Sequence, residues 1–283
     1  MIMKIMPAVL AGLILISCTQ EEILQNDKPN QNVNQTTLEI RELTDEYLNT
    51  DRPEGWNWGS IARAVSADLM MAGTLGGTAL GATAASGGIL AVPAAVAVTA
   101  ASTAASYGAS SIAPPPSGNT VILNAQIEAV ITNPSNGNDQ IGAWHNLALV
   151  EVFANCNTCT PEEALEQART YLMNDLSLIE SEMPISLQSS IDWLNKYDYN
   201  QTDILVNIFE AGDCTSNVYN AIDSYMTAIE AQGNYEDFCA YSKAFENIVF
   251  TSTTYTNQEK AQLLSMASVA RYSAAFWLNS FYY

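Results

Sequence analysis

The chain has 283 residues and is strongly acidic, with 30 Asp and Glu against 10 Lys and Arg and a formal net charge of −20. This balance argues against binding to nucleic acid, which needs a basic patch, and against docking on anionic lipid. A chain of this length can hold one sizeable core.

The N-terminal residues 1–17 predict a secretory signal peptide. Lys4 supplies an early positive charge, and the apolar run from Ala8 to Ile16 is too short for a membrane anchor. The run closes on Leu15-Ile16-Ser17-Cys18, which resembles a bacterial lipobox. The resemblance implies cleavage between Ser17 and Cys18 and a lipid (palmitate) on Cys18. The alternative is a plain secretory signal with an incidental cysteine.

Residues 18–37 predict a flexible tether. The segment from Gln25 to Thr37 is rich in Asn and Gln and cannot bury enough apolar surface to become ordered. Glu21 and Glu22 directly follow the cysteine region and resemble the surface-export signals of Bacteroidota lipoproteins. We therefore expect a lipid-anchored outer-membrane protein that is exposed at the cell surface.

Residues 38–118 predict an amphipathic helix, over 38–49, and then a Gly/Ala-rich helical hairpin. The hairpin region from Ala64 to Ala113 carries no charge after Asp68. Ser86-Gly87-Gly88 predicts the turn between two helical arms, and Pro93 fits the first turn of the second arm.

The first arm contains a glycine repeat, Gly73, Gly77 and Gly81, which lines one helix face with bare backbone. Each glycine costs about 1 kcal/mol relative to alanine in a helix interior, so close packing against another helix is expected to offset that cost. Two arrangements remain open: the hairpin packs on the helices that follow or on a partner, or it inserts into a membrane. The arms are long enough to span a bilayer, but strongly apolar residues are sparse.

Residues 119–283 predict an acidic all-α domain. Capping boxes at Thr160–Glu163 and Thr256–Glu259 mark two helix starts. Apolar residues recur at helical spacing and no stretch alternates with period two. Helices are expected over 120–131, 139–154, 160–179, 187–197, 203–210, 216–232, 236–249 and 256–281. The predicted fold class is thus all-α, a helical hairpin followed by a bundle-like multi-helix domain.

Four cysteines remain besides Cys18: Cys156, Cys159, Cys214 and Cys239. In an oxidising compartment this even number predicts two structural disulfides, with the pairing left open. The CxxC of Cys156 and Cys159 could also be a redox pair or half of a zinc site. A zinc site needs a matching second half, and a redox pair would favour a βαβ context; neither is found. No metal and no cofactor are expected.

His145 is the only histidine, and it precedes Asn146 in a predicted helix. These two residues are the candidate functional polar pair. A catalytic base needs a nucleophile and an orienting partner, and the sequence contains no phosphate loop and no nucleophile elbow. We expect a structural role for His145, no catalytic residues and no enzyme activity.

Two short motifs, IGAWHN and SVARYSAAFW, complete a wider pattern with the lipobox, the tether and the Gly/Ala-rich segment. The pattern resembles a group of Bacteroidota outer-membrane lipoproteins of unknown function, whose Gly-rich segment is similar to bacteriocin-like peptides. Ile141-Gly142, His145-Asn146 and Ser268 to Ser273 carry the resemblance.

The resemblance implies no activity that can be transferred. It leaves two functions open. One is a surface-tethered lipoprotein with a structural or protein-interaction role, with a protein partner or self-association through the hairpin. The other is an antagonism factor whose hairpin inserts into a target membrane. Gly87-Gly88 lies in mid-chain rather than at the end of a short leader, which departs from the bacteriocin pattern.

Overall fold

In the computed structural model, the described residues are 34–50, 58–79, 86–110, 129–156, 158–197, 203–231 and 234–281. Their regular structure is entirely helical, with no β-strand within these ranges, so the predicted all-α fold class is confirmed. The signal peptide, most of the tether and most of the helix expected over 120–131 lie outside the described residues.

The helices follow the predicted order closely. Their bounds are α2 Gln35–Asn49, α3 Trp58–Ala79, α4 Val92–Ser110, α6 Asp139–Asn155, α7 Pro161–Asp175, α8 Leu187–Lys196, α9 Ile204–Glu210, α10 Ser216–Glu230, α11 Tyr235–Thr251 and α12 Asn257–Phe281, with short 3₁₀ turns η1 Ser86–Gly88 and η2 Glu180–Glu182.

Two predicted boundaries are wrong. Helix α2 begins at Gln35, inside the predicted tether, where Thr36 and Thr37 are buried, and α7 ends at Asp175 rather than near residue 179. Ser177 adopts a left-handed conformation with φ 55°, which stops the helix. The N–H of Leu178 then reaches back to the carbonyl of Met173, and that of Ser177 reaches the carbonyl of Asn174. This is the Schellman arrangement, formed here around serine in place of the usual glycine.

Both predicted capping boxes form. In the first, Glu163 donates its N–H to Thr160 Oγ1 (3.3 Å), and its carboxylate accepts the N–H of Thr160 (2.8 Å). Thr256 and Glu259 repeat the pattern at the start of α12. The second oxygen of Glu259 also accepts a hydrogen bond from Thr215, the N-cap of α10. The second box therefore fixes the start of α12 against the start of α10.

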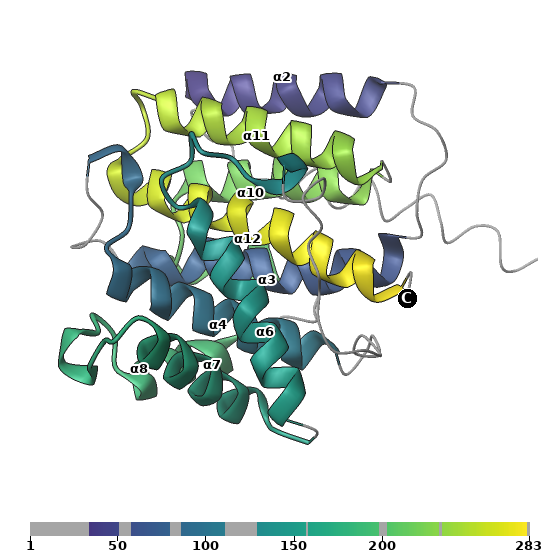
Figure 1. Ribbon diagram of the computed structural model, residues 1–283. Helices are drawn as coiled ribbons and strands as arrows, with labels where there is room; N and C mark the ends of the chain where they lie inside the picture. The colour runs from purple at the N-terminus through teal and green to yellow at the C-terminus, as the bar shows by residue number, and fades with distance from the viewer. Residues whose placement is uncertain are drawn as a thin grey trace, which may run out of the picture. The chain divides into compact units, whose positions relative to one another are not determined.

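Helix α12 lies at the centre of the bundle (Figure 1). In that view α2, α10 and α11 lie above it, and α3, α4, α7 and α8 lie below. Every residue from Ala261 to Leu278 is buried. A helix that is covered on all sides belongs to the interior of a domain, so α12 organises the core.

The two hairpin helices, α3 and α4, lie in the same compact unit as the helices that follow, which spans Val33–Tyr283. Gly87 and Gly88 both have positive φ, 80° and 81°, as the predicted turn requires. Every residue of α4 from Ala94 to Ser106 is buried. Among the described residues, no helix combines the length and the apolar character needed to cross a membrane.

Candidate functional site

The predicted site residues at the N-terminus and in the glycine repeat are only partly described. Ser17, Cys18 and Gly81 lie outside the described residues, so cleavage and lipidation stay predictions. Gly77 lies within α3, but its surroundings are not among those described. A Cβ built on Gly73 would lie 3.1 Å from Ile222 Cδ1. Gly73 therefore faces α10, and its neighbour there is the end of a flexible side chain.

His145 lies at the centre of a fully buried polar cluster built by four helices. Its Nε2 lies 3.4 Å from the carboxylate of Asp68, on α3. Ser106 on α4 donates to the same carboxylate oxygen (2.9 Å), and so does Ser273 on α12. His145 Nδ1 lies 3.3 Å from the amide oxygen of Asn146. Asp68, His145, Ser106 and Ser273 all have 0% exposure.

The cluster has the residue types of a hydrolase triad but not its geometry. In a triad the serine hydroxyl donates to the histidine, which takes its proton. Here Ser106 and Ser273 both donate to Asp68, so neither of these two hydroxyls donates to His145. The contacts instead join the hairpin to α6 and α12, which is the arrangement expected of a structural histidine.

Asp68 supplies a pH-dependent test of this cluster. Burial raises the pKa of Asp68, although His145, Ser273 and Ser106 act in the opposite direction. The folded protein then holds a proton in a pH range where the unfolded chain has lost it, so the free energy of unfolding falls as pH rises through that range. Asp68→Asn removes this titration and keeps an acceptor for the serines. We expect the stability of the variant relative to wild type to increase as pH rises above about 4, by about 1.4 kcal/mol per unit of pKa elevation.

Urea unfolding at a series of pH values measures this difference. The exposed Asp45→Asn on α2 is the matched control and should show no such trend. A difference between Asp68→Asn and wild type that stays constant from pH 4 to 8 would contradict a raised pKa at Asp68.

A second buried polar cluster surrounds Arg271 of α12, which is 0% exposed. Its guanidinium donates to Glu246 on α11 (2.8 Å), to Asp139 at the start of α6 (2.5 Å) and to the carbonyl of Ile131. Burial acts to lower the pKa of Arg271, but Glu246 and Asp139 outweigh it and raise that pKa. Asn133 donates a further hydrogen bond to Glu246. The cation is thus fully enclosed by its partners.

The two short motifs that carry the sequence resemblance contact each other through hydrogen bonds. The N–H of Gly142 donates to Ser268 Oγ (3.1 Å), and that hydroxyl donates to the carbonyl of Asp139 (2.9 Å). Asn146 donates to the carbonyl of Tyr272 (2.8 Å). IGAWHN and SVARYSAAFW therefore form one contact between α6 and α12. The roles of Arg271, Glu246, Asp139 and Asp68 were not predicted. The available signals were Arg271, the single charge between Ala261 and Phe281, and Asp68, the last charge before the uncharged run of the hairpin.

The cysteines form one disulfide where two were predicted. Cys156 and Cys159 are bonded, with their Cα atoms 5.2 Å apart. The second expected pair is wrong, because Cys214 and Cys239 are both free and buried. Burial raises the pKa of Cys214 to about 12 and that of Cys239 to about 11, so both remain neutral thiols near pH 7.

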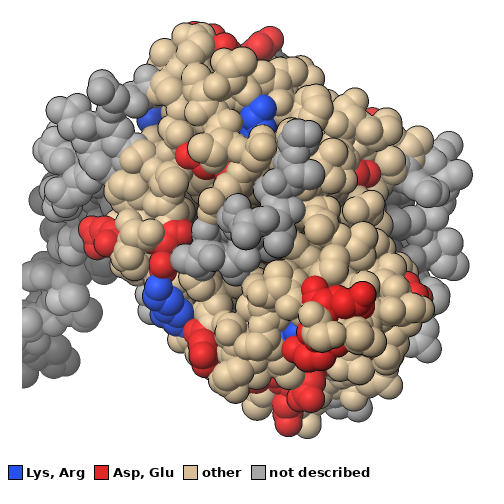
Figure 2. Space-filling view, turned by 90° about the vertical axis from the view of Figure 1, so that its left-hand side faces the viewer, with Lys and Arg blue, Asp and Glu red and all other residues tan. Residues whose placement is uncertain are grey.

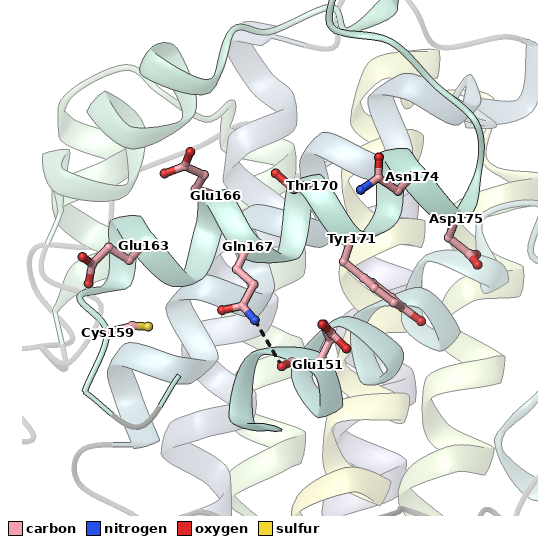
Figure 3. Close-up of a pocket in the computed structure, with 9 residues that line it drawn as sticks. All are labelled: Glu151, Cys159, Glu163, Glu166, Gln167, Thr170, Tyr171, Asn174 and Asp175. Atoms are coloured by element: carbon pink, nitrogen blue, oxygen red, sulfur yellow. Dashed lines mark hydrogen bonds between the residues drawn. The ribbon is translucent and has the colours of Figure 1, made fainter. Parts of the chain in front are cut away.

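A surface groove of about 770 Å³ lies beside the disulfide, between α6 and α7 (Figure 3). Its acidic members are Glu151 from α6 and Glu163, Glu166 and Asp175 from α7; none of its lining residues is Lys or Arg. Burial raises the pKa of Tyr171 in the groove, and Asp175 and Glu151 raise it further. The complete lining is Glu151, Cys159, Glu163, Glu166, Gln167, Thr170, Tyr171, Asn174 and Asp175.

The groove is one acidic part of an acidic surface. Figure 2 shows Asp and Glu gathered in the lower part of one face, at the height where α7 and α8 lie in Figure 1, with few Lys or Arg. Within the described ranges no group of three or more His, Cys, Asp or Glu could hold a metal ion. The carboxylates of the groove give it a diffuse negative field.

Comparison with known proteins finds no matching protein family, no similar curated protein and no similar solved structure.

Proposed function

We propose that the protein is a surface-tethered outer-membrane lipoprotein with a protein-interaction role and no catalytic turnover. The lipobox-like Leu15-Ile16-Ser17-Cys18 supports the tether. The groove between α6 and α7 supports the interaction, and it is the observation that carries the proposal. Its occupant is a cationic segment of a partner protein.

The charge of the groove favours such a segment. Glu166 and Asp175 form no ion pair within the described residues, so both carboxylates are available to a cation. Glu163 and Glu151 already accept hydrogen bonds from Thr160 and Asn155 and add negative potential. Electrostatic complementarity of this kind determines which partners associate and how fast.

The shape of the groove favours an extended peptide. The lining residues of α7 recur every three to four positions and therefore follow one face of the helix. Figure 3 shows them in a row, with Cys159 at one end and Asp175 at the other. A helix of 15 residues is about 22 Å long, which matches about six residues of extended chain.

Cell fractionation tests the tether. The wild-type protein should be recovered from the membrane fraction before solubilisation, whereas Cys18→Ala should be recovered from the soluble fraction.

Hexalysine binding to the full-length protein in uncharged detergent micelles tests the groove. The double variant Glu166→Gln, Asp175→Asn should bind hexalysine about five-fold more weakly at low salt, because two exposed ion pairs are lost. The affinity of the wild type should fall as ionic strength rises.

The matched control removes the same charge elsewhere, with Glu42→Gln and Asp45→Asn on α2. Equal weakening by the control and the groove variant would mean that hexalysine responds only to the net charge of −20. That result would contradict the assignment of the groove as the binding site for a cationic segment.

A further inference from the structure

The disulfide Cys156–Cys159 opens onto the groove through one of its two sulfurs. Cys159 lines the groove and is half-buried, whereas Cys156 is only 5% exposed. Figure 3 places Cys159 at the end of the groove where α7 begins, near Gln167. The side-chain amide of Gln167 also contacts the sulfur of Cys156. A molecule bound in the groove therefore lies beside Cys159 and not beside Cys156.

This disulfide contributes little as a structural cross-link. It joins two residues only three positions apart, and short loops gain the least stability from being closed. The ends of α6 and α7 are already held by other contacts. The capping box of Thr160 and Glu163 fixes the start of α7, and Gln167 donates to the carbonyl of Glu151 on α6 (3.4 Å). A disulfide at this position therefore adds little to the stability of the fold.

We infer that Cys156–Cys159 is a thiol–disulfide exchange site, in which a dithiol peptide held in the groove attacks Cys159. The inference goes beyond the interaction role. The exchange chemistry stands on the position of the disulfide alone, whereas the preference for a cationic peptide rests on the proposed function of the groove.

The two sulfurs differ in their surroundings in a way that gives the exchange a direction. Cys159 directly precedes Thr160, the N-cap of α7, and lines the groove, where a bound thiolate can reach its sulfur. Cys156 is the C-cap of α6 and is buried, so a thiolate in the groove cannot reach its sulfur. Cys159 is therefore the sulfur that exchanges with the partner, and Cys156 is the sulfur that is released and protonated.

The exchange balances without any other oxidant. A peptide thiolate attacks Cys159 Sγ, the Cys159–Cys156 bond breaks, and Cys156 leaves as a thiolate that takes a proton from water. The second peptide thiolate then attacks the peptide sulfur of the mixed disulfide and releases Cys159. The peptide loses two electrons and two protons and becomes a disulfide, and the protein becomes a dithiol.

The test incubates the oxidised full-length protein with a hexapeptide that carries two cysteines and four lysines, under native conditions. Samples are quenched in acid and alkylated, and mass spectrometry counts the reduced Cys156 and Cys159. We expect one peptide disulfide to form per protein disulfide lost. The single variants are incubated instead with the oxidised form of the same peptide, whose disulfide is attacked by the remaining protein thiolate and releases one peptide thiol. The mixed disulfide should form on Cys159 in Cys156→Ser at least ten-fold faster than on Cys156 in Cys159→Ser.

Two outcomes would overturn the exchange site. One is a disulfide that resists the peptide under native conditions and is reduced only in urea, which would make it a structural cross-link. The other is formation of the mixed disulfide at equal rates in the two single variants, which would contradict the preference for attack on Cys159. Cys214 and Cys239 are present in every variant and serve as internal controls, because both should stay unmodified.

A second peptide, with four glutamates in place of the lysines, separates this inference from the function of the groove. The rate of each hexapeptide with the protein is divided by its rate with a short Cys-Asn-Thr-Cys peptide that carries the same disulfide. This ratio cancels the effect of the different thiol pKa values of the two hexapeptides. The lysine peptide should react at least five-fold faster, and Glu166→Gln with Asp175→Asn should reduce that ratio. Equal corrected rates would overturn the cationic preference and leave the exchange intact.

Discussion

Replacing Arg271 with methionine is expected to lower the free energy of unfolding by about 3–5 kcal/mol. The guanidinium is buried and pairs with both Glu246 and Asp139. Burial raises the pKa of Glu246, and Arg271 is the largest influence that opposes this rise. Without the cation, Glu246 must either stay charged in a buried site or take up a proton, and both cost free energy.

Urea unfolding followed by circular dichroism measures the loss. The control Lys243→Met removes the same charge from half-buried Lys243 on α11 and should cost no more than about 1 kcal/mol. The double variant Arg271→Met, Glu246→Gln should be more stable than the sum of the two single changes implies, because the residues share one network. A loss below about 1 kcal/mol for Arg271→Met would contradict the pairing.

Gly142→Ala is expected to be the second strongly destabilising change, at about 3 kcal/mol. A Cβ at this position would lie 2.3 Å from Tyr272 Cδ2 and 2.6 Å from the carbonyl oxygen of Ser268. Because one of these atoms belongs to the backbone of α12, the helices must move apart, and overpacking typically costs about 1–3 kcal/mol or more. Alanine is the better helix former by about 1 kcal/mol, so the predicted sign is opposite to the intrinsic preference.

Gly73→Ala is the matched control, since Gly73 also lies in the interior of a helix. Its Cβ would meet the end of the Ile222 side chain at 3.1 Å, and that side chain can shift. Thermal unfolding should place Gly73→Ala within about 1 kcal/mol of wild type. If Gly142→Ala proves as stable as Gly73→Ala, the close contact between α6 and α12 is not required.

Local patterns allowed most of the helices to be predicted. The Thr160–Glu163 box and the Gly87-Gly88 turn depend on residues close in sequence, and both form as expected. The end of α7 was missed because Ser177, not glycine, adopts the left-handed conformation. Signals of this kind are short-range, so they specify helices without specifying which helices meet.

The candidate site depends on contacts that sequence periodicity cannot provide. Asp68 and Ser273 are 205 positions apart, and Arg271 and Asp139 are 132 apart. The glycine repeat drew attention to Gly73, whereas the tightest described contact of a helical glycine is at Gly142. The groove was also not predicted, because its carboxylates were interpreted only as a helix cap and a solvated acidic surface.

The position of α12 has a consequence for the timing of folding. The central helix follows every other described helix in the chain, so the buried clusters that include it cannot close until it emerges, whereas the cluster between α4, α6 and α7 contains no residue of α12. Contacts of such long sequence separation form slowly. In a chain that carries the secretory signal proposed for residues 1–17, this delay would keep the newly made polypeptide competent for translocation. The order of the helices thus leaves the central core incomplete until α12 has been made.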